Sequence, residues 1–338
     1  MKKNLFFISV AVLALSSCNN DTVVDENLSA NQPKEIAIQA IATPTTRAAV
    51  NGTTFTPTTM EVAAWDVTNG RDFFTATTFT KDASTWKGGK YWPLSAAYIN
   101  FLAYTEFNGT SATWNKAGDG KAASGVTLVM TDNKTAQKDL MYAIGHAEVT
   151  QTSNTLNFPT DPVSMTFKHA QAWVCFMADA YDATSGGKVT LKSITLNGAK
   201  YNGTYVVTHT NYDASSSQSV AGVWTVATDD AQDDIAVPNW TEALIAYDGT
   251  GDGVTVGDGL LIVPDDNAST ADFTSFTIAY SLDGNDYTYT YTPQTAAAAN
   301  VDQAKKYTFK INFHLHEIEI APSVTDWQEG GPTDVPIF

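Results

Sequence analysis

We predict an all-β fold from two features of the sequence. Short segments rich in Val, Ile, Thr, Tyr and Phe alternate with clusters of Gly, Asn, Asp and Ser, and no stretch keeps an apolar period of 3.6 residues long enough for a major helix. Near the C-terminus, Phe276, Ile278 and Tyr280 share one face while Thr277 and Ala279 take the other, which is the alternation of a half-buried sheet. A β-sandwich architecture follows from this patterning.

The predicted strands share this composition or alternation. They are Glu35–Ala42, Tyr98–Tyr104, Val163–Phe167, Ala172–Ala178, Val189–Leu196, Thr204–Thr208, Gly259–Val263, Phe276–Leu282, Tyr287–Thr292 and Tyr307–Ile320. Between two of them stands Asp283-Gly284, a strong signal for a hairpin turn. The one candidate helix, Gln294–Lys305, has a run of alanines but no apolar stripe, so we expect a loop with a turn or two there.

The N-terminus predicts a bacterial lipoprotein signal peptide. Lys2 and Lys3 supply its charged start, and Leu5–Leu15 form an apolar core that is shorter than the roughly 20 residues of a membrane helix. The segment Leu15–Cys18 then has the small residues and the cysteine of a lipobox. Signal peptidase would cleave before Cys18, and lipid on Cys18 would hold the mature protein on a membrane, outside the cytoplasm. The alternative is an ordinary secretory signal with an incidental cysteine.

The rest of the chain is predicted to form a tether and two domains. The tether is rich in Asn, Asp and Ser without apolar periodicity, and two prolines interrupt the strand pattern at Asn157–Pro162, where we place the domain boundary. The expected organisation is a signal peptide at 1–17, a tether at 18–34, an N-terminal β-sandwich at 35–160 and a C-terminal β-sandwich at 161–338. We expect Phe101, Tyr104 and Leu140 in the first core, and Phe167, Val174, Phe176 and Leu196 in the second.

The chain is acidic, with a formal net charge of -17. Removing residues 1–17 takes away two lysines, so the charge falls from -17 to -19. Nucleic acid is therefore not an expected partner, because no basic cluster is present to bind a polyanion. Once Cys18 is lipidated, Cys175 is the single cysteine left, and no internal disulfide can form. Its place in the apolar run Ala172–Met177 favours a buried small hydrophobe over a reactive thiol.

The sequence offers no enzymatic motif. It lacks a G-x-S-x-G turn, an H-E-x-x-H motif and a Gly-rich phosphate loop, so we expect no catalytic residue, no metal and no cofactor. His314 and His316 share a strand face but make an incomplete metal site, and for His169 we expect a structural hydrogen bond. The loop Asp248–Gly253 lacks the glutamate of an EF-hand, and the cluster Asp229–Asp234 could bind calcium weakly. Solvated loops are the favoured interpretation of both.

The tryptophans leave a sugar-binding alternative open. There are eight, and most lie in or beside patterned strands, as Trp92 and Trp173 do, which favours core packing. Trp86, Trp114 and Trp240 stand in polar contexts and are candidates for an exposed stacking platform. A carbohydrate-binding surface lipoprotein that does not polymerise is therefore the alternative function.

A series of short motifs runs from the lipobox almost to the C-terminus. They are Tyr91–Pro93, Ile99–Tyr104, Lys138–Ala143, Val163–Ala170, Ile194–Gly198, Gly203–Tyr205, Leu261–Pro264, Lys306–Phe309 and Val324–Trp327. In their order and spacing these motifs resemble the fimbrillin family, the type V pilins of Bacteroides-like bacteria. The resemblance implies two tandem transthyretin-like β-sandwiches, surface delivery as a lipoprotein and polymerisation into fimbriae.

The same resemblance implies a maturation step. In that family an Arg-specific protease removes the N-terminal strand, and a strand from the next subunit fills the groove that opens. An exposed sheet edge offers unpaired N–H and C=O groups, which an inserted strand pairs while burying alternate apolar side chains. In the candidate removable strand of this chain, the alternating residues are Ile36, Ile38, Ala40 and Ala42.

Arg47 is the candidate processing site. The chain holds two arginines, Arg47 and Arg71, and Arg47 follows Pro44 in an expected exposed linker. Cleavage between Arg47 and Ala48 would remove the tether and the strand together. The alternative is an ordinary solvated arginine with no processing.

The predicted location is the outer membrane, exposed at the cell surface, and then the fimbrium after processing. The predicted partners are other fimbrial subunits, an Arg-specific protease, the membrane through the lipid, and an unidentified host or bacterial surface ligand. The donor strand is less well marked. The tail after Trp327 holds Gly330, Gly331, Pro332 and Pro336, which favours a tip or accessory subunit. The other candidate donor, Glu317–Trp327, could instead complete the second sandwich.

Overall fold

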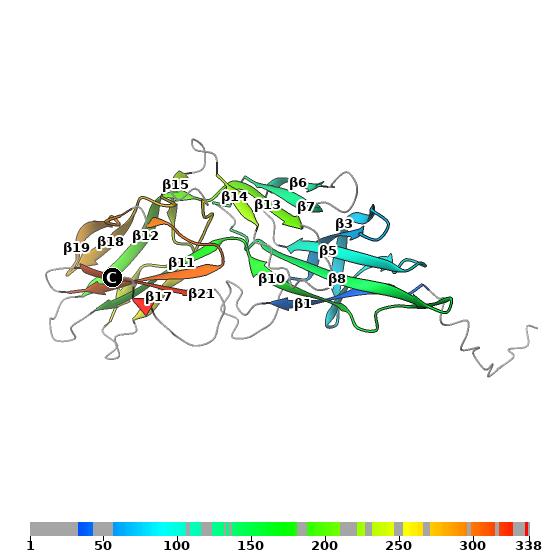
Figure 1. The fold of residues 1–338 in the computed structure, drawn as a ribbon. Coiled ribbons are helices and arrows are strands. Elements are labelled where there is room, and N and C mark those ends of the chain that lie inside the picture. Colours follow the sequence, from blue (N-terminus) through cyan, green and yellow to red (C-terminus); the bar gives the residue numbers. More distant parts are fainter. Residues whose placement is uncertain are drawn as a thin grey trace, which may run out of the picture.

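The molecule consists of β-strands arranged in two lobes that lie end to end (Figure 1). The computed structural model describes residues 33–42, 57–105, 109–115, 124–131, 133–134, 137–180, 188–209, 222–226, 232–246, 253–265, 271–295, 299–314, 318–326 and 335–336. These residues contain no α-helix, which confirms the all-β prediction, and consequently none of them belongs to a helix that could cross a membrane.

The first lobe is built on one large sheet. In spatial order its strands are β10 (Val163–His169), β1 (Glu35–Ala42), β4 (Thr85–Tyr91), β3 (Arg71–Asp82), β2 (Thr59–Asp66), β5 (Ala97–Thr105), β8 (Met141–Thr152) and β9 (Thr155–Asn157). The end of β10 also pairs with the start of β8, so the sheet closes into a ring. The inside of this ring holds a core with Phe79, Phe101 and Phe167.

A second, smaller sheet joins the two lobes. Its order is β14 (Val223–Thr225), β13 (Gly203–His209), β7 (Ser124–Met130) and β6 (Gly109–Asn115). Strands β6 and β7 come from the first half of the chain, whereas β13 and β14 come from the second half. This joining sheet covers the outer face of β2, β5 and β8, and the core between them includes Trp65, Tyr104, Leu140, Tyr205 and Trp224.

The second lobe is a sandwich of two sheets. One has the order β17 (Val254–Ile262), β11 (Ala172–Ala180), β20 (Lys305–Phe313), β21 (Ile318–Asp326) and β22 (Val335–Pro336). The other has the order β15 (Gln232–Ala236), β12 (Val189–Lys200), β18 (Ser275–Leu282) and β19 (Asn285–Tyr291), with β16 (Ala243–Ile245) also paired to β12. Their inner faces meet at Phe176, Phe276 and Phe309, whose ring centroids lie 5.1–5.8 Å apart.

Most of the predicted strands coincide with observed ones, but several observed strands, among them β2, β3 and β8, were not predicted. Asp283 and Gly284 both have positive φ (51° and 81°), as the predicted hairpin turn requires. The predicted strand Tyr307–Ile320 is wrong as one element, because β20 and β21 are two antiparallel strands in which Ile311 faces Ile320. In the part of Gln294–Lys305 that the structure describes there is no α-helix, as expected.

The residues predicted to be buried are distributed among the cores differently from the expectation. Phe101 lies in the ring, while Tyr104 and Leu140 pack under the joining sheet. Val174, Phe176 and Leu196 lie in the second-lobe core, as predicted. Phe167 does not, because β10 pairs with β1 and β8 and so belongs to the first lobe. The division at residues 160 and 161 stays a prediction, although β10, which follows it, is hydrogen-bonded within the first sheet.

Candidate functional site

Strand β1 is an interior strand of the first sheet, with a neighbour on each side. It runs parallel to β10, with pairs from Ile38–Val163 to Ala42–Phe167. On the other side it runs antiparallel to β4, where Ala37 pairs with Lys87. In Figure 1 it lies along the lower side of the first lobe, beneath β8. Strand β1 therefore supplies the backbone hydrogen-bonding partner of β10 on one side and of β4 on the other.

The two faces of β1 differ sharply. Ile36 and Ile38 are fully buried in the ring core, and Ala40 packs partly against it. Gln39 and Ile41 point outward and are exposed. The structure thus places three of the four predicted alternating residues on the inner face, and the fourth, Ala42, pairs with Phe167 through the backbone. Their displacement during assembly stays a prediction.

Contacts at the start of β1 hold it in register. The Trp92 N–H donates to the Lys34 carbonyl (2.9 Å), and the Gly89 N–H donates to the Glu35 carboxylate (3.2 Å). The Lys34 ammonium donates to the carbonyls of Pro159 and Thr160, just before β10. The side-chain contacts of Lys34 and Glu35 are exposed, so solvent competes for them, and the buried isoleucines carry most of the attachment.

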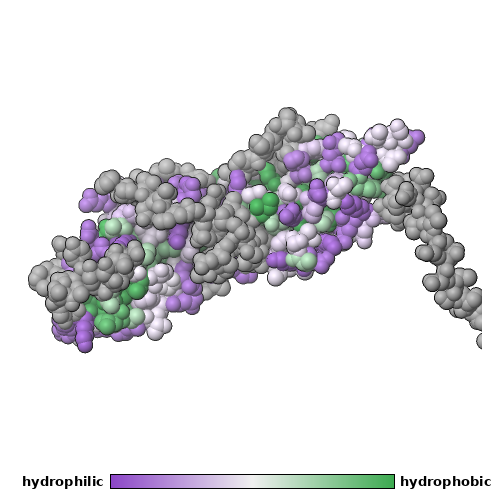
Figure 2. Space-filling view, turned by 90° about the horizontal axis from the view of Figure 1, so that it is seen from below, coloured by the Kyte–Doolittle hydropathy of each residue, from purple (hydrophilic) through white to green (hydrophobic). Residues whose placement is uncertain are grey.

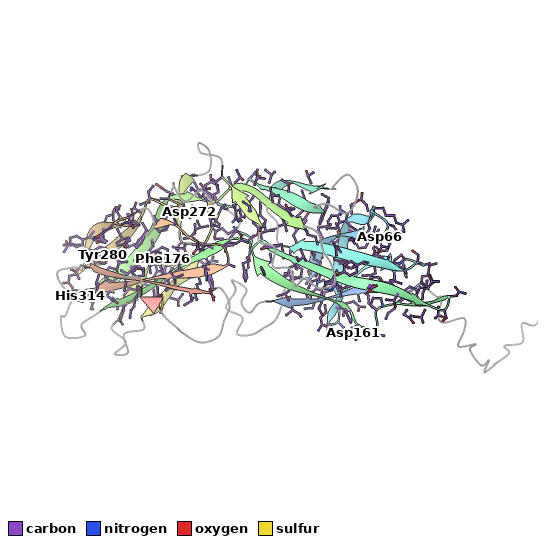
Figure 3. All side chains as sticks on the ribbon, in the orientation of Figure 1. Asp66, Asp161, Phe176, Asp272, Tyr280 and His314 are labelled. Atoms are coloured by element: carbon purple, nitrogen blue, oxygen red, sulfur yellow. The ribbon has the colours of Figure 1, made fainter. Side chains whose placement is uncertain are left out.

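The two arginines have different surroundings. Arg71 opens β3 opposite Asp66, and its Nε donates to the fully buried Asp66 carboxylate at 3.2 Å. The same carboxylate accepts hydrogen bonds from the backbone and side chain of Asn69, which closes the turn; Asp66 is labelled in Figure 3. Arg71 is therefore part of a paired hairpin, a conformation that a protease cleft does not accept without local unfolding. Arg47 lies outside the described residues, as do Ala48 and Cys18.

The histidines have structural surroundings. His169 is buried, and its Nδ1 is hydrogen-bonded to Asp139 at 2.9 Å, which confirms the structural hydrogen bond expected for it. His314, at the far end of the second lobe (Figure 3), lies 3.4 Å from the Glu319 carboxylate, and His316 is outside the described residues. Among the residues that the structure describes, no group of three or more metal-ligating side chains occurs.

The acidic loops fall mostly outside the described residues. This applies to 248–252 and to Asp229 and Asp230. Asp233 forms an ion pair with Lys134, and this hydrogen bond lowers the pKa of its carboxyl. Asp234 accepts a hydrogen bond from the Gly198 N–H at 3.1 Å. Asp233 and Asp234, the described half of the cluster, thus both bind other groups of the protein. Cys175 is buried, as predicted.

The three candidate tryptophans do not form a common platform. Trp86 is wrongly predicted as exposed: it is buried in the ring core, with its Nε1 bonded to the Pro57 carbonyl. Trp114 lies on β6 of the joining sheet and packs against the core beneath it, with its ring centroid 6.3 Å from that of Trp65. Trp240 packs against the second-lobe core.

Seen from below, the side on which β1 lies, the described surface of the first lobe is mostly hydrophilic (Figure 2).

Sequence reasoning found β1 but not its neighbours. The alternation of Ile36, Ile38 and Ala40 predicts a strand with one buried face, yet it carries no information about which strands lie beside it. The signal for β10 was present in Met165 and Phe167, which are buried in the same core as β1, but a strand pattern alone could not assign them to that core.

This arrangement belongs to a known family. The family model for fimbrillin-like proteins matches residues 35–327, from the first residue of β1 to just beyond the end of β21. The chain therefore belongs to the fimbrillin-like family of structural, non-enzymatic proteins, which confirms both the resemblance and the expectation that it is not an enzyme. Among curated proteins, none matches the chain.

The solved structures that match this chain are distant from it in sequence. A candidate cell adhesion protein from Bacteroides ovatus is 13% identical with a TM-score of 0.49, over 89% of this chain and 100% of that one. Another from Bacteroides uniformis is 16% identical with a TM-score of 0.48, over 87% and 98%. The tip fimbrial protein Mfa3 from Porphyromonas gingivalis, with a C-terminal truncation, is 10% identical with a TM-score of 0.40, over 88% and 100%. The family assignment rests on the family model and not on these structures.

Proposed function

We propose that this protein is a structural or adhesive subunit of cell-surface fimbriae, and that β1 is removed so that a strand of another subunit can take its place. The observation that carries the proposal is the position of β1. It is an interior strand that completes the ring, yet it lies at the N-terminal end of the matched family region, so cleavage after it disconnects it from the rest of the fold.

Loss of β1 would leave a groove that requires a new strand. Burying an aliphatic side chain contributes about 1.5–3 kcal/mol, so Ile36 and Ile38 together contribute roughly 3–6 kcal/mol that the vacated site could offer to a replacement. The edges of β10 and β4 would also lose their hydrogen-bonding partner. An incoming strand with branched apolar residues at two alternate positions would restore both the apolar burial and the hydrogen bonds to β10 and β4.

Arg47 is the proposed cleavage site. It follows β1 by a few residues, and Arg71 is held in the β2–β3 hairpin, which supports selective cleavage at Arg47. The segment lost from 18 to 47 holds four acids and two bases, so the formal charge moves only from -19 to -17. The proposed switch therefore acts through the vacated strand site rather than through electrostatics.

We further propose a lipid anchor at Cys18, exposure on the outer membrane before processing, and two tandem transthyretin-like sandwiches. The proposed partners are other fimbrial subunits and an Arg-specific protease. Of the two donor candidates, Glu317–Trp327 is largely occupied as β21, which pairs with β20 along its whole length. The described part of the tail is the short β22, which pairs with β21 at Val324. This supports a tip or accessory position.

Limited proteolysis tests the proposal. The wild type, Arg47→Ala and the matched control Arg71→Lys are treated with an Arg-specific protease, and each is then offered a labelled peptide with the sequence of Glu35–Ala42. We expect the wild type and Arg71→Lys to gain an N-terminus at Ala48 and to take up the peptide, while Arg47→Ala does neither. Equal peptide uptake by the cleaved wild type and by Arg47→Ala would contradict the proposal.

A further inference from the structure

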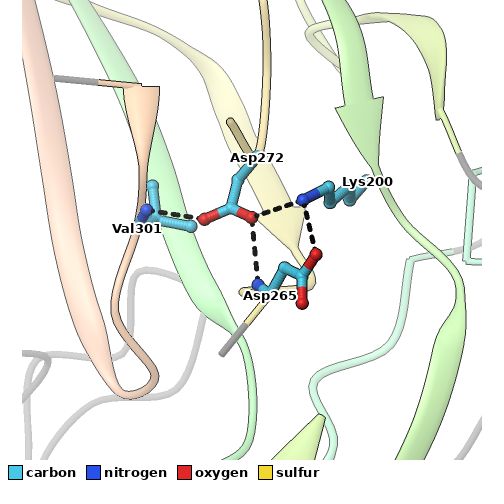
Figure 4. Close-up of polar contacts among 4 residues, drawn as sticks. All are labelled: Lys200, Asp265, Asp272 and Val301. Carbon is cyan, nitrogen blue, oxygen red and sulfur yellow. Dashed lines mark hydrogen bonds and ion pairs between the residues drawn. The ribbon is translucent and has the colours of Figure 1, made fainter. Parts of the chain in front are cut away.

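The side chain of Lys200 is buried between the carboxylates of Asp265 and Asp272 (Figure 4). Its Nζ lies 3.0 Å from Oδ2 of Asp265 and 3.2 Å from Oδ1 of Asp272. The exposed fractions of the side chains are 3% for Lys200, 1% for Asp272 and 12% for Asp265. An amine and two carboxyl groups are thus held in contact where little water reaches them.

Backbone hydrogen bonds fix the three groups relative to one another. The Lys200 N–H donates to the Asp272 carbonyl and the Val263 N–H donates to the Lys200 carbonyl, both at 3.0 Å. The Asp272 N–H donates to the Ala299 carbonyl, also at 3.0 Å. Lys200, at the end of β12, therefore contacts Val263 and Asp265, which follow β17, and Asp272, which precedes β18. Such fixed contact lowers the entropic part of the barrier to a reaction between two side chains.

The carboxyl group of Asp272 is polarised by the backbone. Its Oδ2 accepts a hydrogen bond from the Val301 N–H at 2.8 Å, and its Oδ1 accepts one from the Asp265 N–H at 3.0 Å (Figure 4). Donors in these positions stabilise negative charge that develops on the oxygens when a nucleophile attacks the carbon between them. Burial also raises the pKa of the Asp272 carboxyl, which favours its protonated, electrophilic form.

We propose that Lys200 and Asp272 condense to form an intramolecular amide bond, with Asp265 as the catalytic base. In the proposed reaction the Lys200 ammonium first passes a proton to Asp272, which gives an amine and an uncharged carboxylic acid. The Nζ lone pair then attacks Cγ of Asp272 while the Asp265 carboxylate takes a proton from the nitrogen. Asp265 returns this proton to the departing hydroxyl group, which leaves as water. Asp265 is unchanged, and the reaction needs no oxidant or other reactant.

The bond would link residues that are 72 positions apart in the sequence. Lys200 follows Ala199 of the second-lobe core, and its carbonyl binds Val263 of the core under the joining sheet. A covalent link there would connect the second-lobe core to the core under the joining sheet. It would constrain the unfolded chain as a disulfide does.

Peptide mapping of the purified full chain tests the proposal without depending on strand exchange. Proteolysis and tandem mass spectrometry should recover the peptides of Lys200 and Asp272 joined, and lighter by one water than their sum. Complete recovery of the two peptides as separate species would overturn the proposal, and a link from Lys200 to Asp265 would overturn the assigned roles.

Variants separate this chemistry from an ordinary ion pair. Asp272→Asn should still form the link but lose ammonia instead of water, so its joined peptides should match the wild type in mass. Lys200→Arg and Asp265→Asn should give separate peptides. The matched control is Lys192→Arg, because Lys192 forms a surface pair with Asp286 at 2.6 Å and should leave the link intact. An unlinked Lys192→Arg protein, or a linked Asp265→Asn protein, would count against the mechanism.

Discussion

Replacing Ile38 by alanine should loosen β1 without changing the rest of the sheet. Ile38 is fully buried in the ring core between β4 and β10. Truncation of a buried isoleucine to alanine costs about 2–5 kcal/mol, through lost burial and the cavity that remains. At 2–4 °C per kcal/mol for a cooperative unit of this size, the uncleaved protein should melt roughly 4–20 °C lower.

The same substitution should weaken the retention of β1 once the chain is cut after Arg47. A loss of 2–5 kcal/mol corresponds to roughly 30- to 4,000-fold weaker binding of the severed strand, because each 1.4 kcal/mol is tenfold. Release of the strand is measured by size-exclusion chromatography with mass spectrometry of the peptide. Gln39→Ala is the matched control, since Gln39 is exposed on the same strand and should change stability by no more than about 0.5 kcal/mol. Similar behaviour of the two variants would refute the assignment of the buried face.

Three further predictions test other parts of the account. Metabolic labelling with a fatty-acid analogue should mark the wild type and not Cys18→Ala. Equal labelling of the two proteins would contradict the proposed lipid anchor. Phe176→Ala should lower stability by about 3–5 kcal/mol in denaturant unfolding, whereas Leu244→Ala, at an exposed position, should have little effect; equal effects would contradict the second-lobe core. Burial raises the pKa of Tyr104 to about 12, so its contribution to stability should be present below pH 10, where the unfolded phenol is neutral, and be lost between about pH 10 and 12. Tyr104→Phe should therefore be less sensitive to alkali, and an unchanged alkaline transition would contradict this.

Strands with a clear local alternation were predictable, whereas others, among them β2, β3 and β8, were not identified from the sequence. The alternation of Ile36, Ile38 and Ala40 gave β1 with the correct bounds, and Asp283-Gly284 gave the hairpin between β18 and β19. In each case the information lies in neighbouring residues, where side chains alternate between two faces.

Strand partners were not predictable, because pairing depends on residues far apart in the sequence. Strand β10 follows the expected domain boundary but pairs with β1, and β13 crosses to β7 in the joining sheet. Trp86 was misjudged for a related reason: its sequence neighbours are polar, while its ring is covered by other strands of the first lobe. The ion pairs of Lys200 lie 65 and 72 positions away and leave no local signal.

The most direct test of the proposed assembly is the N-terminal sequence of this subunit in fibres sheared from the cell surface. The account predicts subunits that begin at Ala48 and contain no peptide from Glu35–Ala42, with no incorporation of Arg47→Ala protein. Fibres built from subunits that retain β1, or that incorporate Arg47→Ala at the wild-type level, would contradict it.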